Sequence, residues 1–403
     1  MPIDFNTNVT YINPPQIIRQ EHKISQRQQK DVFVKNTDKN FDGIKIEKRP
    51  FGKIKKTGEK AELYTITNRN GASVDLSSFG ATITAIRVPD KNGKLIDVTQ
   101  GYNSVTPYEE SPIGHAGGTI GPYANKISNG SFTLGENFYQ LECNKDNGKS
   151  HSHGGKEGLD VQNWNAKVLK EGIEFSYLKK DDESGYPGDV LTKVTYKFDN
   201  DNNLHINYNA TSDKDTIINL TNHTYFNLDG AQNAEENSIL SHLVKLPNST
   251  KITKINEIGI PTGEFLDIEN TPFDFREEKI LGKDIDSKNE QMLFAKGYDH
   301  NFCIDGYDGK TLINAAEVKS NYSGIKLKVS TNLPGFQFYS ANNLGKTSQP
   351  NGKNGKKYEK RSGFCIEPQF YPNAINTETF REKGILKANE EYSREIIYSF
   401  EVE

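Results

Sequence analysis

Short runs of β-branched and apolar residues recur along most of the chain, separated by clusters of Gly, Asn and Asp. Such runs occupy residues 61–67, 73–76, 81–88, 173–177, 191–198, 204–210, 325–330 and 336–339. Runs of this length between turn-forming residues are typical of β-strands, and stretches with helical periodicity are few and short. The pattern predicts an all-β fold, a large antiparallel β-sandwich with few short helices.

The first part of the chain has a different texture. Residues 1–43 are polar and rich in Gln, Asn and Lys, and within them residues 16–30 could form a short helix. We expect this segment to be a flexible or loosely docked extension. No repeat of fixed period and no Pro/Gly-rich linker follows, so residues 44–403 are expected to form one domain of catalytic size.

Charge and hydropathy argue against a nucleic-acid-binding, membrane-bound or secreted protein. Lys and Arg number 50 against 54 Asp and Glu, a formal net charge of -4, which argues against nucleic acid or an anionic membrane as the main partner. No apolar run approaches the roughly 20 residues that cross a bilayer. The N-terminus lacks a basic start followed by an apolar stretch, so no secretory signal is expected.

Cysteine usage and two sequons indicate the compartment. Cys143, Cys303 and Cys365 offer neither a disulfide framework nor zinc-ligand spacing, which fits a reducing environment. Asn219 and Asn222 begin glycosylation sequons inside a polar cluster, where glycans would obstruct a functional site. We therefore expect a cytoplasmic protein.

That polar cluster lies in residues 216–230, where an apolar strand is predicted to run into Asn, Thr and His residues around Tyr225. Buried polar groups cost stability unless each finds a partner, whereas a site that holds hydroxyls and moves a proton needs them. His223 is the candidate proton donor, because an imidazole exists in both protonation states near neutrality. The stretch alone leaves a second interpretation open, a histidine satisfied by neighbouring asparagines.

Two glycine-containing segments carry further polar residues. In residues 117–127, glycines allow close backbone approach, and Asn125 and Lys126 can bond to hydroxyls; no phosphate-loop motif is present. In residues 150–155, His151 and His153 could face one side of a strand as a metal pair. No further ligands nearby complete a metal site, so we expect His153 to lie in a tight or mobile turn that lines a cleft.

Two more segments carry candidate site residues. In residues 297–302, Asp299 lies between an aromatic and a polar pair, an arrangement suited to vicinal sugar hydroxyls. In residues 363–376, Glu367 follows an apolar run and precedes Pro368, which is expected to end the strand. Partial desolvation there would raise the carboxyl pKa toward that of a useful base. A polar turn and a salt-bridged rim glutamate are the respective alternatives.

Together these segments resemble the aldose 1-epimerase family, over residues 44–403. The matching motifs follow the family's order: Ala124-Asn125-Lys126, His153-Gly154-Gly155, residues 222–228 (NHTYFNL), residues 298–302 (YDHNF) and Glu367-Pro368-Gln369. The resemblance implies a large twisted antiparallel β-sandwich and interconversion of the α- and β-anomers of free aldoses such as galactose and glucose.

The resemblance also implies roles for particular residues. Glu367 would be the general base at the C1 hydroxyl, His223 the general acid at the ring oxygen, and His153 would assist near that oxygen. The implied hydroxyl-holding residues are Asn125, Lys126, Tyr225, Asp299 and Gln337. Opening a hemiacetal needs one proton removed and one added, so no metal or organic cofactor is expected.

The chain departs from the family pattern in the glycine-rich segment, where two arginines are usual. Pro122 and Lys126 occupy those positions, and lysine keeps the charge but loses the planar fork that bonds two hydroxyls. We expect weaker sugar binding or an altered preference. The alternatives are a hexose-phosphate mutarotase, for which only Lys126 supplies a matched cation, and a non-catalytic sugar-binding protein. A monomer or homodimer is expected.

Overall fold

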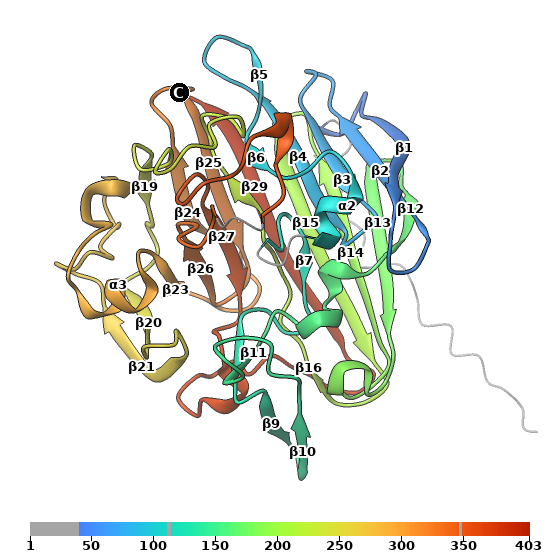
Figure 1. The fold of residues 1–403 in the computed structure, drawn as a ribbon, viewed down its shortest axis with the longest axis vertical. Helices are drawn as coiled ribbons and strands as arrows, with labels where there is room; N and C mark the ends of the chain where they lie inside the picture. The colour runs from blue at the N-terminus through green and yellow to red at the C-terminus, as the bar shows by residue number, and fades with distance from the viewer. Residues whose placement is uncertain (1–39, 111–113, 346–348) are drawn as a thin grey trace, which may run out of the picture. The chain divides into compact units, whose positions relative to one another are not determined.

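The computed structural model describes residues 40–110, 114–345 and 349–403. Of the predicted extension, residues 1–39 lie outside this described part. A nine-stranded antiparallel sheet is the largest element, with its strands side by side in Figure 1. In spatial order they are β12 (Asn165–Val168), β13 (Gly172–Lys179), β14 (Val190–Phe198), β15 (Asn203–Ser212), β29 (Glu391–Val402), β25 (Ile325–Thr331), β24 (Ile313–Lys319), β19 (Leu243–Lys245) and β22 (Lys279–Ile280).

Two five-stranded antiparallel sheets accompany it. The first is formed by β1 (Lys45–Lys53), β2 (Lys60–Thr67), β3 (Ser73–Ser77), β4 (Thr82–Pro89) and β5 (Leu95–Asp97). The second has the order β21 (Pro261–Asp267), β20 (Lys251–Ile255), β23 (Asp299–Cys303), β26 (Gly335–Tyr339) and β27 (Cys365–Gln369).

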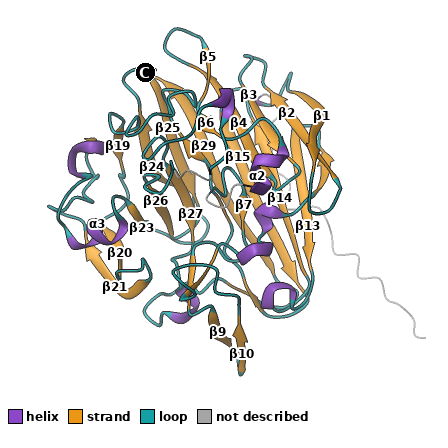
Figure 2. Ribbon diagram, viewed as in Figure 1, coloured by secondary structure: helices purple, strands orange, loops and turns teal. Residues whose placement is uncertain are grey.

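The remaining strands form two-stranded pairs, and helices are few (Figure 2). The pairs are β9 (Ser131–Leu134) with β10 (Asn137–Gln140), β8 (Lys126–Ser128) with β11 (Ser150–Ser152), β16 (Thr216–Ile217) with β28 (Ile385–Leu386), β7 (Thr119–Ile120) with β17 (Thr221–Asn222), and β6 (Thr99–Gln100) with β18 (Tyr225–Phe226). The α-helices α2 (Val105–Glu110) and α3 (Glu290–Ala295) have six residues each. The all-β prediction is confirmed. Among the described residues, no helix is long and apolar enough to cross a membrane.

Alternating burial explains why the main sheets form. In β14 and β15 every second side chain is buried, while its neighbours are exposed or half-buried, as expected for strands with one face on a core. One apolar cluster includes residues of all three large sheets. Tyr64 of β2 packs edge-on against Phe175 of β13, with ring centroids 5.8 Å apart, so the first five-stranded sheet packs on the nine-stranded one.

Two sequence predictions about strand ends are wrong. Residues 216–220 do not form one buried strand, because Thr216–Ile217 pair with β28 and Asn219 forms an isolated bridge with Tyr123 before the chain pairs with β7 and then β6. Pro368 does not end its strand, since it lies inside β27 opposite Phe336. That strand is at the edge of its sheet, where a residue without an N–H is tolerated.

Candidate active site

The two candidate proton-transfer groups meet at the centre of the site. His223 lies between the short strands β17 and β18, and Glu367 lies in the middle of β27. Nε2 of His223 is 3.7 Å from Oε1 of Glu367, and the two side chains are 7% and 3% exposed. The structure therefore brings together two residues that are far apart in the sequence, at a buried position that most water cannot reach.

Backbone hydrogen bonds fix the position of His223. Its N–H donates to the carbonyl of Gly118 at 3.1 Å, and its own carbonyl accepts from the N–H of Gly117 at 2.9 Å. The side-chain amide of Asn222 donates to the Gly117 carbonyl at 2.8 Å. Hydrogen bonds thus join the glycine-rich segment to the polar cluster. They also give the buried side-chain amide of Asn222 a partner.

Burial shifts the two groups in opposite directions. Desolvation, with a smaller effect of the charge on His115, lowers the pKa of His223 to about 3. Desolvation, followed by the negative charge of Asp299, raises the pKa of Glu367 well above its usual value. Because burial disfavours both charged forms, the pair is held with neutral imidazole and protonated carboxyl, and one proton between them.

One oxygen of the Glu367 carboxyl has no hydrogen-bond partner in the described part of the chain. Oε2 of Glu367 is buried, and no other described residue forms a hydrogen bond with it. A buried oxygen without a partner is costly. The atom is well suited to a hydroxyl of a bound ligand, which would remove that cost.

The third neighbour of this pair is a thiol. Sγ of Cys365 lies 3.6 Å from Nδ1 of His223, and Cys365 and Glu367 share one face of β27 because they are two residues apart on that strand. One donor atom from each of His223, Cys365 and Glu367 lies within 4.8 Å of the others, a donor set that a transition metal could use. Burial raises the pKa of the Cys365 thiol well above its usual value, which opposes the thiolate that metals bind.

Amide and carboxylate groups continue from Glu367 across the second five-stranded sheet. Gln337 of β26 pairs with Glu367 in register, and its Nε2 donates to Oδ1 of Asp299 at 2.7 Å. Burial raises the pKa of Asp299, partly offset by that hydrogen bond. The rings of Tyr225 and Tyr339, 6.2 Å apart at their centroids, lie beside the imidazole of His223.

The glycine-rich segment supplies the other side of the site. The N–H of Asn125 donates to Nδ1 of His153 at 3.4 Å, and His153 has a positive φ of 55° before Gly154, as expected for the predicted tight turn. The centroid of the His153 ring is 5.5 Å from that of His223. Lys126 is engaged elsewhere in the protein, by Asp146 at 2.9 Å and by the carbonyl of Ile258.

All of the predicted site residues therefore fall in one region, and His151 does not. Its Nε2 contacts the hydroxyl of buried Tyr186 at 2.7 Å and its Nδ1 the carbonyl of Glu142, which removes it from any metal pair with His153. His115, Tyr339 and Cys365 also lie beside His223, and none of them was predicted as a site residue. Tyr339 belongs to a predicted strand, Cys365 was considered only for the redox compartment, and no motif pointed to His115.

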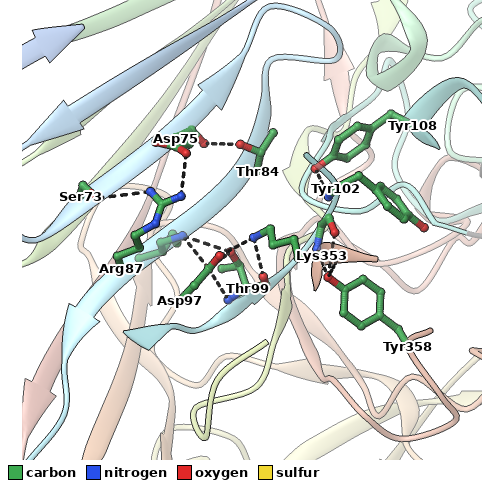
Figure 3. A network of polar contacts seen from close by, with 12 residues as sticks. Ser73, Asp75, Thr84, Arg87, Asp97, Thr99, Tyr102, Tyr108, Lys353 and Tyr358 are labelled. Atoms are coloured by element: carbon green, nitrogen blue, oxygen red, sulfur yellow. Dashed lines mark hydrogen bonds and ion pairs between the residues drawn. The ribbon is translucent and has the colours of Figure 1, made fainter. Parts of the chain in front are cut away.

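A buried polar network supports the aromatic side of the site (Figure 3). Nζ of Lys353 donates to Oδ2 of Asp97 at 2.6 Å and to the carbonyl of Thr99 at 2.9 Å. The hydroxyl of Tyr358 donates to the Gly101 carbonyl at 2.7 Å. These bonds tie residues 353–358 to the segment that carries Tyr102 beside the site.

The chain is similar in sequence to known proteins. The family model described as aldose 1-epimerase matches residues 62–399. The galactose mutarotase of Bos taurus is 39% identical over 330 residues, covering 82% of this chain and 91% of that protein. The aldose 1-epimerase of Escherichia coli K12 is 33% identical over 348 residues, covering 85% and 96%.

Solved structures of aldose epimerases are similar to this chain in fold. A crystal structure of an aldose epimerase homologue from C. elegans has a TM-score of 0.75 and 29% identity, covering 85% of this chain and 99% of that one. The galactose 1-epimerase of Lactobacillus acidophilus has a TM-score of 0.74 and 27% identity, covering 89% and 99%.

Proposed function

Because the chain belongs to the aldose 1-epimerase family, we propose that it interconverts the α- and β-anomers of free aldoses such as galactose and glucose. The observation that carries the proposal is the buried pair formed by His223 and Glu367, 3.7 Å apart. Opening a cyclic hemiacetal requires one proton to leave the C1 hydroxyl and one to reach the ring oxygen. A carboxylate and an imidazole at this separation are suited to both transfers.

In the proposed reaction Glu367 takes the proton of the C1 hydroxyl while His223 gives a proton to the ring oxygen. The C1–O5 bond breaks, the aldehyde forms, the C1–C2 bond rotates, and the ring closes on the other face of the carbonyl as both protons return. Each positioned group contributes about 10² to 10⁴ in rate. No metal or organic cofactor enters a step.

The pKa shifts identify which state of the pair the pocket favours. Neutral His223 with protonated Glu367 is the state reached once the ring has opened, and burial stabilises it relative to the charged pair. The total number of protons on the pair is the same in both states. The pocket therefore favours the open-chain intermediate, and the sugar must support the charged pair at the start.

The remaining residues would bind the sugar. We assign His153 to the ring oxygen or its neighbouring hydroxyl, and the other hydroxyls to a set that spans both sides of the pair. That set is Asn125, Lys126, Tyr225, Asp299 and Gln337. Lys126 already bonds to Asp146 and Ile258, which agrees with the weaker sugar contact expected from lysine at this position.

We also propose a cellular location, a class of partner and an oligomeric state for the protein. Three cysteines and the sequons inside the site support a cytoplasmic location, and the charge balance supports a small-molecule partner without nucleic acid or membrane. A monomer or homodimer is proposed. A hexose phosphate would need more cations than Lys126, and a binding protein would not need both proton-transfer groups.

Polarimetry tests the proposal. Freshly dissolved α-D-galactose and α-D-glucose should reach rotational equilibrium faster with the protein than without it, and Glu367→Gln should lower kcat by about 10² to 10⁴, because an amide cannot accept the proton. The matched control is Glu317→Gln on β24, whose carboxylate pairs with Lys326 at 3.2 Å and should leave turnover unchanged. No acceleration with any free aldose would refute the proposal.

A further inference from the structure

Three imidazole rings, not two, gather at the site. The ring centroid of His115 lies 4.7 Å from that of His153 and 5.8 Å from that of His223. His115 precedes Gly117 and Gly118, the residues that bond to the backbone of His223. Its side chain is 29% exposed, in contrast to the buried His223, so a ligand can reach it.

A buried carboxylate holds His115 in place. Nδ1 of His115 lies 2.7 Å from Oδ2 of Asp160, whose side chain is 6% exposed. Its other oxygen, Oδ1, is buried and forms no hydrogen bond with any described residue. A carboxylate this buried needs a partner, and it can only accept. Nδ1 of His115 therefore carries the hydrogen of this bond, and Nε2 is the ring atom left for a ligand.

The backbone is built for this contact. A Cβ at residue 118 would lie 2.8 Å from the Cβ of Asp160, closer than side-chain carbons approach each other. Glycine at 118 thus lets the segment after His115 pack against the 3₁₀ turn Leu159–Val161, which carries Asp160. The close approach keeps the imidazole and the carboxylate within hydrogen-bond distance.

The pair also borders a cavity. Its volume is about 670 Å³, and its lining includes Thr82, Tyr102, Tyr108, His115, Gly118 and Asp160. Small-molecule sites usually have about 300–1,000 Å³. Since His115 also packs against His153 and His223, it lies where this cavity adjoins the proton-transfer pair.

We propose that His115, oriented by Asp160, is a substrate-binding residue whose Nε2 forms a hydrogen bond with a hydroxyl of the bound aldose. This inference rests on the proposed function. It assigns a polar contact in a segment where Pro122 offers no donor, and it makes Asp160 a positioning residue that acts through the imidazole. Loss of Nε2 weakens sugar binding without removing either proton-transfer group.

Two substitutions separate binding from a merely structural role. The amide nitrogen of asparagine can take the place of Nδ1, and that of glutamine the place of Nε2. His115→Asn keeps the bond to Asp160 and loses the ligand atom, so its KM should rise about 5- to 50-fold with kcat within about 3-fold. His115→Gln keeps a donor toward the sugar but loses the bond to Asp160, so its KM should rise less than that of His115→Asn.

Asp160→Asn gives the second readout. It should raise KM when His115 is present and have no further effect on KM in the His115→Ala background, because the carboxylate acts through the ring. The control is His205→Asn, which removes another carboxylate-paired imidazole, one bonded to Asp199 and Glu395 on the nine-stranded sheet. Its KM should not change.

The outcomes are distinguishable. Near-normal KM in His115→Asn with impaired His115→Gln would show that the ring only braces Asp160, and would overturn the inference, as would unchanged KM in both. An unsubstituted protein that fails to accelerate mutarotation of any aldose refutes the proposed function instead.

Discussion

In the proposed mechanism, two buried side chains share a single proton. His223 and Glu367 are almost fully buried, and a low dielectric makes each charged form costly. The neutral pair avoids both costs while keeping one donor and one acceptor in contact. Since mutarotation runs in both directions through the same open chain, a pair that gains and gives up one proton at each end suits it.

The pH dependence of kcat/KM should reflect the proton that His223 and Glu367 share. The pKa of His223 is lowered to about 3 and that of Glu367 is raised, so between these limits the pair carries one proton. We expect kcat/KM to show no acid limb near the usual histidine value of about 6.5. It should fall on the alkaline side, where the pair loses its proton.

Initial rates by polarimetry, corrected for the uncatalysed reaction at each pH, give this profile. An acid limb with a midpoint near the ordinary histidine value would mean that His223 titrates as a solvated imidazole, contrary to its burial.

At the scale of elements, the sequence predicted where the strands lie. The eight apolar runs fall in strands of the large sheets, apart from Ala81 just before β4. One-sided burial leaves a period of two in the runs of β14, β15 and β25, whereas the runs in β3 and β26 are buried on both faces. The pattern failed at Pro368, since the rule against proline does not hold for an edge strand and edge position is a tertiary property. It failed at residues 216–220 because polar partners from three other segments divide that stretch.

The candidate site was predictable where motifs carry it, as for His223, Glu367 and Asp299. His115 and Asp160 were not, because they are 45 residues apart and meet only through the fold. Cys365 and Tyr339 read as ordinary strand residues, and nothing in their spacing indicates that they face His223. The resemblance to a family could not supply these contacts, since they depend on packing in this chain.

We expect the hydrogen bonds of Lys353 to stabilise the attachment of residues 353–358 to the rest of the fold. The side chains of Lys353 and Asp97 are 11% and 19% exposed, and removing one partner leaves a largely buried charge. Lys353→Met should lower the free energy of unfolding by about 1–3 kcal/mol. Urea denaturation followed by circular dichroism measures the change.

The matched control is Lys180→Met, because Lys180 pairs with Asp189 at 2.7 Å while 64% exposed. Exposed pairs contribute little, so this variant should match the unsubstituted protein. Equal effects of the two substitutions would show that the buried network adds nothing beyond an ordinary surface pair.

At the scale of the whole described part of the chain, the last strand completes the largest sheet. β29 lies between β15 and β25, so the sheet that carries the core cannot close until the C-terminal residues pair. His205 of β15 marks this junction. Its Nδ1 lies 3.3 Å from Glu395 of β29 and its Nε2 3.5 Å from Asp199.

The stability of this junction should depend on pH. Burial lowers the pKa of His205, but the carboxylates of Asp199 and Glu395 outweigh it and raise the value to about 9. The usual unfolded value is about 6.5. A raised folded pKa gives stability that is fully present below the unfolded value and is lost as pH rises through the folded one. His205→Gln should therefore destabilise the protein most near pH 6, by about 1–3 kcal/mol after allowing for partial exposure.

Urea unfolding at pH 6 and at pH 9.5 measures this difference for both proteins. At pH 9.5 most of the difference in free energy of unfolding between the two proteins should be gone. The reason is that the imidazole of the unsubstituted protein has then lost its charge in the folded state as well. A gap of the same size at both values would mean that His205 contributes by packing against Phe41, 6.1 Å away at the ring centroids, and not by its charge. The ion pair between β15 and β29 would then have no part in holding the sheet closed.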